Sequence, residues 1–125
     1  MIDPRRVPSI GPLEAHERLA SPADETREPI LLDVREPDEF FRVRAPGCVL
    51  LPLSQFVAEY EALPRDRPIL VLCNSGNRSL NATAFLLAKG WRDVTNVSGG
   101  IIAWERAGLE VRRGPVEPGE GELRA

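Results

Sequence analysis

Residues 69–79 read ILVLCNSGNRS, and this stretch decides the fold. Its first four residues are aliphatic, which is typical of a strand buried on both faces of a parallel sheet. Cys73 then begins a short polar loop that contains Gly76, and a helical pattern follows from about Arg78 to Lys89. A strand that passes through a short loop into a helix is typical of α/β proteins.

The segments on either side of this stretch repeat the alternation. Strands are predicted at 7–10, 30–34, 49–51 and 94–97, and helices around 13–19, from Pro37, from a Ser54 cap to Leu63, and over 101–107. The connections between successive strands are too long for hairpins. The sequence therefore predicts an α/β fold with a mostly parallel sheet that helices cover on both faces.

Length and charge limit the possible partners. With 125 residues the chain fits one domain, and a net charge of −3 without a long basic stretch does not suggest nucleic acid or an anionic membrane. No apolar run approaches the ~20 residues of a membrane-spanning helix, and the first residues lack a secretory apolar stretch. We therefore expect a cytoplasmic protein that binds neither nucleic acid nor membrane.

Two cysteines and one histidine restrict the chemistry. Cys48 and Cys73 do not make a disulfide scaffold and are expected as free thiols in a reducing compartment. Because they form no CxxC pair and His16 is the only histidine, neither a zinc site nor a cofactor is predicted. Residues 112–125 are acidic and rich in proline and glycine, which predicts a mobile tail behind a domain of residues 1–111.

The position of Cys73 points to a nucleophile. Ligand sites of open α/β sheets lie at the carboxyl ends of the strands, where Cys73 is expected. The N–H groups of a loop that enters a helix can hold an anion, and Gly76 permits the positive φ that such a loop needs. The same groups would stabilise a thiolate or a persulfide, while Arg78 either supports the loop carbonyls or faces the anion.

A structural role for Cys73 is the alternative, because a free cysteine at a strand end is often only a small core residue. Two features favour the nucleophile. The sequence changes abruptly from aliphatic to polar residues after position 72, and a helix begins almost at once.

Three separated motifs resemble the rhodanese (thiosulfate sulfurtransferase) family. They are LDVREPDEF at 32–40, CNSGNRS at 73–79 and GGIIAW at 99–104, and the resemblance extends over roughly residues 9–111. It implies a single-domain, rhodanese-like α/β fold with a five-stranded sheet. It also implies a sulfurtransferase that takes a sulfane sulfur from a small donor such as thiosulfate. The sulfur would be held as a persulfide and passed to cyanide, a thiol or a protein acceptor.

The resemblance also assigns roles to individual residues. Cys73 matches the catalytic cysteine, and the substrate-binding loop around it consists of Asn74, Ser75, Gly76, Asn77 and Arg78. Asp33 and Arg35 match a motif that braces the fold by charge pairing. Gly99, Gly100 and Trp104 match a structural turn and a core contact.

One segment departs from the family's pattern. Residues 43–48 read VRAPGC where the family usually has a sequence close to GHIPGA. We expect Arg44 to be a solvated side chain in a surface turn, although it can also add positive charge to the rim of the site. Cys48 is expected to be a small buried residue that starts a strand. The alternative, a disulfide with Cys73, requires Cα atoms within about 7 Å.

Two other functions stay open from the sequence. A phosphatase of the Cdc25 type or an arsenate reductase uses a cysteine in a similar loop, but the phosphatase loop reads Cys-x5-Arg and this one reads Cys-x4-Arg. A persulfide carrier or partner-binding module with little turnover would keep the same cysteine. The motifs do not encode the physiological donor and acceptor or the oligomeric state.

Overall fold

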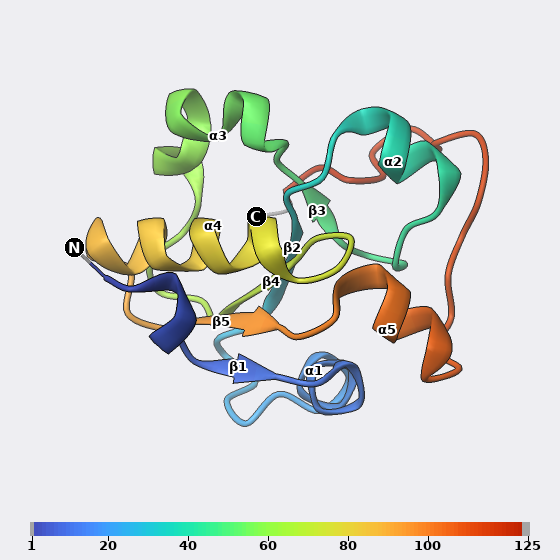
Figure 1. Ribbon diagram of the computed structural model, residues 1–125. Coiled ribbons are helices and arrows are strands. Elements are labelled where there is room, and N and C mark those ends of the chain that lie inside the picture. The colour runs from blue at the N-terminus through green and yellow to red at the C-terminus, as the bar shows by residue number, and fades with distance from the viewer. Residues whose placement is uncertain (1, 124–125) are drawn as a thin grey trace.

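A five-stranded sheet forms the centre of the molecule (Figure 1). The computed structural model describes residues 2–123. The strands are β1 (Ser9–Ile10), β2 (Ile30–Asp33), β3 (Val49–Leu50), β4 (Ile69–Leu72) and β5 (Val94–Val97). They lie in the order β1-β5-β4-β2-β3, and every neighbouring pair is parallel. The predicted five-stranded, mostly parallel sheet is therefore confirmed, with β4 at its centre.

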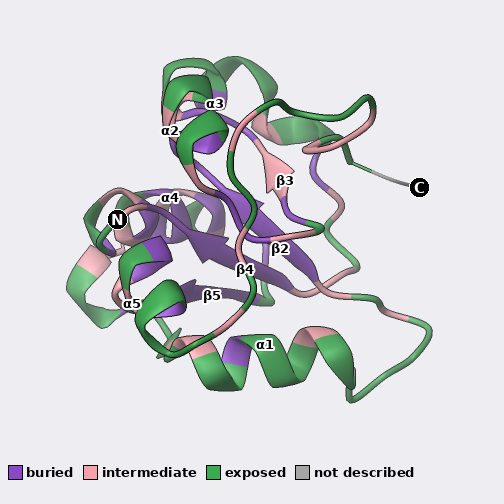
Figure 2. Cartoon of the chain, turned by 90° about the vertical axis from the view of Figure 1, so that its right-hand side faces the viewer, coloured by how far each residue is buried: buried purple, intermediate pink, exposed green. Residues whose placement is uncertain are grey.

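Helices cover both faces of the sheet, as predicted (Figure 2). They are α1 (Pro12–Ala20), α2 (Pro37–Arg42), α3 (Leu53–Glu59), α4 (Asn77–Ala88) and α5 (Gly100–Arg106), with short 3-10 turns at Pro4–Arg6 and Tyr60–Ala62. One core packs α3 and α4 against the sheet through Phe56 and Leu86. The other core packs α1, α2 and α5 against the opposite face through Ala15, Phe40 and Trp104.

Alternate residues of the central strands enter the two cores. Leu32 and Val71 belong to the core beneath α3 and α4, whereas Leu31 and Leu70 belong to the other one. All four residues of β4 are buried, which explains why they form a continuous apolar run. Fully burying one such side chain contributes about 1.5–3 kcal/mol, so β4 is a main source of stability and a rigid base for the loop that follows it.

The start of α3 differs from the prediction. Ser54 does not cap this helix, because Pro52 precedes it and Ser54 lies inside the first turn. The Ser54 hydroxyl instead donates to the Glu36 carboxylate at 2.7 Å. A hydrogen bond to an ionised carboxylate is stronger than one to a neutral partner, so the tertiary contact replaces the local cap.

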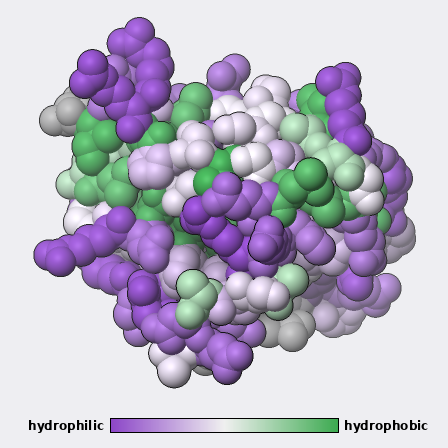
Figure 3. Space-filling view, turned by 90° about the horizontal axis from the view of Figure 1, so that it is seen from below, coloured by the Kyte–Doolittle hydropathy of each residue, from purple (hydrophilic) through white to green (hydrophobic). Residues whose placement is uncertain are grey.

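The face seen from below in Figure 1 mixes hydrophilic and hydrophobic side chains (Figure 3). Its hydrophobic groups stand apart from one another among hydrophilic ones. Leu13 of α1, at 64% exposed, is one of the large hydrophobic side chains that remain outside both cores. Within residues 2–123, none of the helices is long and apolar enough to span a membrane.

The C-terminal segment, residues 112–123, runs back beside β3. The Leu50 N–H donates to the Gly121 carbonyl at 2.8 Å, and Arg112 and Arg44 exchange backbone hydrogen bonds of 2.8 and 2.9 Å. The acidic composition of this segment, rich in proline and glycine, did not predict these contacts, yet residues 112–123 supply backbone and carboxylate partners to the domain. Residues 124–125 of the predicted tail lie outside the described residues, and the mobility of the tail stays a prediction.

The position of Arg44 corrects the sequence interpretation. Arg44 is 2% exposed, so the prediction of a solvated side chain is wrong. Its guanidinium forms an ion pair with Glu120 and donates to the carbonyls of Phe40, Gly114 and Pro115. A guanidinium carries five N–H donors, so it can be buried only where several acceptors converge, and the C-terminal segment supplies most of them here.

Candidate active site

Cys73 lies directly after β4, at the carboxyl edge of the sheet, where ligand sites of α/β folds are found. Its loop runs through Asn74 and Ser75 to Gly76, and α4 begins at Asn77 (Figure 1). Gly76 has a φ of +109°, as predicted, and offers no side chain to cap the helix. Because the first N–H groups of a helix have no partner inside it, those of α4 are available as donors at this loop.

Within residues 2–123, two hydrogen-bonding groups contact the Cys73 sulfur. The Gly76 N–H donates to Sγ at 3.0 Å, and the Ser79 hydroxyl lies 3.3 Å from Sγ. Cys73 is only 1% exposed, so these contacts take the place of water around the sulfur. Both groups can donate a hydrogen to a sulfur anion, whether thiolate or persulfide.

Ser79 connects the cysteine to a buried polar network. Its hydroxyl lies 2.6 Å from Asn96 Oδ1, and Asn96 Nδ2 donates to Ser9 Oγ at 3.2 Å. The hydroxyl has one hydrogen, so Asn96 Oδ1, the Gly76 carbonyl at 3.2 Å and a sulfur anion on Cys73 compete for it. Sequence reasoning missed both Ser79 and Asn96. The available signal was an asparagine inside the buried strand β5, because a buried amide needs hydrogen-bond partners.

Arg78 is held by Glu39 of α2. Two hydrogen bonds of 2.7 Å join its guanidinium to the Glu39 carboxylate, and they lower the pKa of Glu39 to about 2. The positive charge of Arg78 is therefore largely neutralised by the Glu39 carboxylate. Of the two roles that the sequence left open, the structure shows neither, since within residues 2–123 the polar contacts of this side chain go to Glu39.

Helix α5 closes the other side of the loop. The Ile101 N–H donates to the Cys73 carbonyl at 2.8 Å, and the Ile102 N–H donates to the Asn74 carbonyl at 3.2 Å. Gly100 permits this approach, because its φ is +61° and a Cβ at this position would lie 2.4 Å from the Cys73 carbonyl oxygen. The predicted structural turn is confirmed. Through these two hydrogen bonds, the start of α5 holds the backbone of the cysteine loop in place.

Comparisons with known proteins agree with this geometry. Residues 14–107 match the family model described as the rhodanese-like domain. The chain belongs to the rhodanese-like family. A sulfurtransferase from Allochromatium vinosum is 36% identical over 95 residues, which cover 76% of this chain and 89% of that protein. The thiosulfate sulfurtransferase GlpE from Actinobacillus succinogenes is 35% identical over 85 residues, or 68% of this chain and 77% of that protein.

A solved structure shows the same rhodanese-like fold. The crystal structure of a rhodanese-related protein from Thermoplasma volcanium superposes with a TM-score of 0.74 at 30% identity. The match covers 84% of this chain and 97% of that one. The predicted family and fold class are therefore confirmed.

A buried ion pair braces this rhodanese-like domain beside its loop. Arg35 and Asp33 are 1% and 0% exposed, and the Arg35 guanidinium donates to the Asp33 carboxylate at 2.8–3.1 Å. Arg35 also donates to the carbonyls of Glu39 and Val43, at the middle and the end of α2. The predicted charge pairing is confirmed. It ties β2 to the helix that carries Glu39, the partner of Arg78.

The second cysteine of the rhodanese-like domain lies at the opposite, amino edge of the sheet. Cys48 directly precedes β3 and belongs to the core beneath α1, α2 and α5, whereas Cys73 belongs to the other core. The sheet therefore separates the two thiols, and both are free. The disulfide that the sequence left open is not formed.

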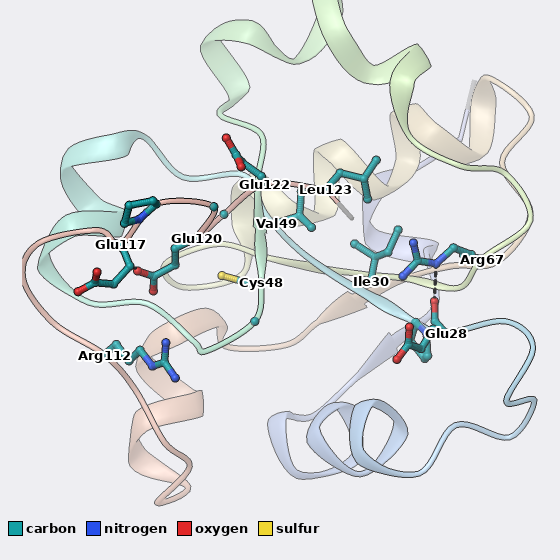
Figure 4. Close-up of a pocket in the computed structure, with 15 residues that line it drawn as sticks. Glu28, Ile30, Cys48, Val49, Arg67, Arg112, Glu117, Glu120, Glu122 and Leu123 are labelled. Carbon is teal, nitrogen blue, oxygen red and sulfur yellow. Dashed lines mark hydrogen bonds between the residues drawn. The ribbon is translucent and has the colours of Figure 1, made fainter. Parts of the chain in front are cut away.

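A hollow of about 450 Å³ lies beside Cys48, between the starts of β2 and β3 and the C-terminal segment (Figure 4). Charged side chains of both signs line it: Glu28, Arg67, Arg112, Glu117, Glu120 and Glu122. Burial, with the charge of Asp33, raises the pKa of Cys48 to about 12. Cys48 is thus a structural residue at the start of a strand, as the sequence predicted.

Proposed function

We propose that this protein is a sulfurtransferase in which Cys73 accepts a sulfane sulfur, carries it as a persulfide and passes it on. One observation carries the proposal, the 3.0 Å hydrogen bond from the Gly76 N–H to Cys73 Sγ at the junction of β4 and α4. Relatives named sulfurtransferase support the same reaction class. The proposed donor is thiosulfate, and the proposed acceptors are cyanide, a thiol or a protein thiolate.

The proposed cycle consists of two displacements. The Cys73 thiolate attacks the sulfane sulfur of thiosulfate, the sulfur–sulfur bond of the donor breaks, and its electron pair leaves with sulfite. Cyanide or a thiolate then attacks the outer sulfur of the Cys73 persulfide. The electron pair of the persulfide bond returns to Cys73, and thiocyanate or a new persulfide is released. Charge is conserved in both steps, and neither step needs a cofactor.

The loop residues have distinct roles in this proposal. The backbone N–H groups of residues 74–77 and of the first turn of α4 hold the negative charge of the persulfide. Ser79 adds a hydroxyl beside the sulfur. Arg78 acts as a positioning residue, because its pair with Glu39 joins the start of α4 to α2.

The rival functions have less support. A phosphatase needs a cation that faces the phosphate, but Arg78 is paired with Glu39. A persulfide carrier would differ from an enzyme only in its turnover, so repeated release of thiocyanate distinguishes the two. The cytoplasm stays the expected compartment, and two cysteines without a disulfide scaffold suit its reducing environment.

Intact mass spectrometry after incubation with thiosulfate tests the proposal. The wild type and Cys48→Ser should each gain one sulfur, about 32 Da, whereas Cys73→Ser should gain none. Cyanide should then remove this mass and release thiocyanate over many cycles. If no sulfane donor loads Cys73, the proposal is wrong and a partner-binding module replaces it. Loading without repeated turnover would identify a carrier.

A further inference from the structure

One cation on α5 has no partner within the described structure. Arg106 is exposed in the last turn of this helix, and within residues 2–123 its side chain makes no ion pair or hydrogen bond. By contrast, Arg78 is paired with Glu39, and Arg35 is paired with the buried Asp33. Arg106 therefore presents a positive charge to which the rest of the described protein supplies no partner.

Arg106 lines an open hollow between α5 and the cysteine loop. The hollow measures about 580 Å³, and the residues around it are Ser75, Gly99, Ile102, Ala103, Arg106 and Ala107. Ser75 belongs to the loop and directly precedes Gly76, whose N–H contacts Cys73 Sγ. The hollow therefore opens beside the backbone that holds the reactive sulfur.

The direction of α5 brings the Arg106 side chain toward the loop. Ile102 and Arg106 are four residues apart, so they lie on one face of the helix. Helical side chains lean toward the N-terminus of their helix, and the start of α5 is the part that contacts the Cys73 and Asn74 carbonyls (Figure 1). Ala103 adds little bulk to this wall of the hollow, because its side chain ends at Cβ.

The residues that line the hollow favour a negatively charged ligand. Among the described residues around it, Arg106 alone is charged, and the others are glycine, alanine, isoleucine and one serine. No carboxylate in this lining competes for the guanidinium. A guanidinium binds two oxygens of an oxyanion at once, and an unpaired cation also draws anions toward a nearby site over several ångströms.

We propose that Arg106 is a specificity-determining residue that binds the oxyanion group of the sulfur donor in this hollow. The inference rests on the proposed sulfurtransferase function and deepens it by naming the side chain that recognises the donor. Donors whose sulfane sulfur is attached to an oxidised, anionic sulfur group, as in thiosulfate, are preferred to uncharged sulfane donors. When Cys73 takes the outer sulfur, this group leaves as sulfite with the electron pair of the broken bond. This oxyanion group is negatively charged both before and after the sulfur is transferred, so the Arg106 guanidinium can bind it at each stage.

Single-turnover sulfur loading from thiosulfate, followed by intact mass, tests the role of Arg106. Arg113→Gln is the matched control, because Arg113 is exposed, is paired with Glu105 and does not line the hollow. The loading rate should fall about tenfold in Arg106→Gln, recover most of its value in Arg106→Lys and change little in Arg113→Gln. Added salt should slow the wild type more than Arg106→Gln, because ions screen the charge.

A second measurement does not depend on sulfur transfer. Iodoacetate and iodoacetamide alkylate a thiolate by the same displacement of iodide, but only iodoacetate is charged. The ratio of their rates at Cys73 should fall about tenfold in Arg106→Gln and stay constant in Arg113→Gln. If persulfide forms but Arg106→Gln changes neither this ratio nor the loading rate, the inference is overturned and the proposed function stands. A lowered ratio in a protein that takes no sulfur would retain the anion site and refute only the proposed function.

Discussion

Cys73 and Cys48 differ little in burial, at 1% and 3% exposed, yet their surroundings have opposite polarity. The Cys73 sulfur meets a backbone N–H and a hydroxyl. Cys48 lies in an apolar core near the Asp33 carboxylate, and burial together with that charge raises its pKa to about 12. Burial alone therefore does not distinguish these two cysteines, whereas the groups that surround each sulfur do.

The two edges of the sheet produce this difference. At the carboxyl edge, a short loop joins β4 to α4, and the first N–H groups of this helix have no partner inside it. Cys73 is the first residue of that loop. At the amino edge, the C-terminal segment lies across the start of β3, and its carboxylates help to line the hollow beside Cys48. One edge thus offers hydrogen-bond donors to an anion, whereas the hollow at the other edge is lined by side chains of both charges, with four glutamates beside Arg67 and Arg112.

Alkylation should separate the two thiols by the largest factor. A thiol with a pKa of about 12 is ionised in about one molecule in ten thousand at pH 8. We therefore expect iodoacetamide to label Cys48 at least about a hundredfold more slowly than Cys73. Because the pKa of Cys48 is raised, its labelling should accelerate about tenfold per pH unit between pH 8 and 10. The mass of Cys73→Ser reports labelling of Cys48, and the mass of Cys48→Ser reports labelling of Cys73. Equal labelling rates in the folded proteins would contradict the difference between the two thiols.

The closure of the amino edge should depend on Arg44. Arg44→Gln removes a buried guanidinium that pairs with the half-buried Glu120 and donates to three backbone carbonyls, and it should lower the free energy of unfolding by about 3 kcal/mol. Trypsin should then cut more quickly after Arg112 or Arg113. Urea denaturation and limited proteolysis measure the two effects, with Arg42→Gln, which removes an exposed ion pair, as the control. A variant as stable and as resistant as the wild type would show that the segment is held by other contacts.

At the carboxyl edge, the packing of α5 against the cysteine loop should depend on Gly100. Gly100→Ala places a Cβ 2.4 Å from the Cys73 carbonyl oxygen at a positive φ, so a loss of about 2 kcal/mol is expected. Sulfur loading of Cys73 should slow in the same variant, because the loop backbone must shift. Gly11→Ala is the control, since Gly11 has an ordinary φ of −78° and no atom within 4 Å of its added Cβ. Equal stability of the two variants would contradict the close packing of α5.

Ser79→Ala should have a smaller effect on stability and a clear effect on the sulfur. It leaves Asn96 Oδ1 without its hydroxyl partner, which costs about 1 kcal/mol, and it removes one of the two groups that contact Cys73 Sγ. Thermal unfolding gives the first effect, and the rate of persulfide formation, expected to fall, gives the second. Ser98→Ala, at an exposed position, provides the control. Unchanged loading in Ser79→Ala would assign the serine to the fold alone.

The smallest effect concerns Glu39 and pH. The folded pKa of Glu39 is lowered to about 2 from an ordinary value of 4.5, so its pair with Arg78 stabilises the protein above about pH 4.5. This contribution is lost as pH falls toward 2. Glu39→Gln keeps an oxygen for the Glu36 N–H but lacks the charge, and should be less stable by about 1 kcal/mol or less at pH 7. Urea titrations should show the difference vanish near pH 2, and a constant difference would argue against this ion pair.

Local patterns explain what could be predicted from the sequence. The apolar run of β4 and the proline at the start of α2 each carry their own signal, so the strand, the helix and the loop between β4 and α4 were predicted near their true positions. Cys73 could be placed for the same reason, because its site is the end of a strand. The conformation of Gly76 followed from the turn that the loop requires.

Long-range partners explain what was missed. Arg44 looked solvated because its acceptor Glu120 is 76 residues away. Arg78 could not be oriented from its loop, since its partner Glu39 lies 39 residues earlier on another helix. Ser54 was interpreted as a cap for the same reason, because the competing Glu36 carboxylate is 18 residues away. Each of these polar side chains is directed by a contact that only the folded chain brings close.

The backbone contact between β3 and Gly121 also bears on how copies of this protein meet one another. β3 is an outer strand, and the unpaired N–H and carbonyl groups of such a strand can recruit a strand from another molecule. Gly121 bridges Val49 and accepts the Leu50 N–H, so the chain occupies this site itself. The other outer strand, β1, is only two residues long. A sheet with one margin covered and the other this short gives little template for intermolecular β-sheet growth, which favours resistance to aggregation in a crowded solution.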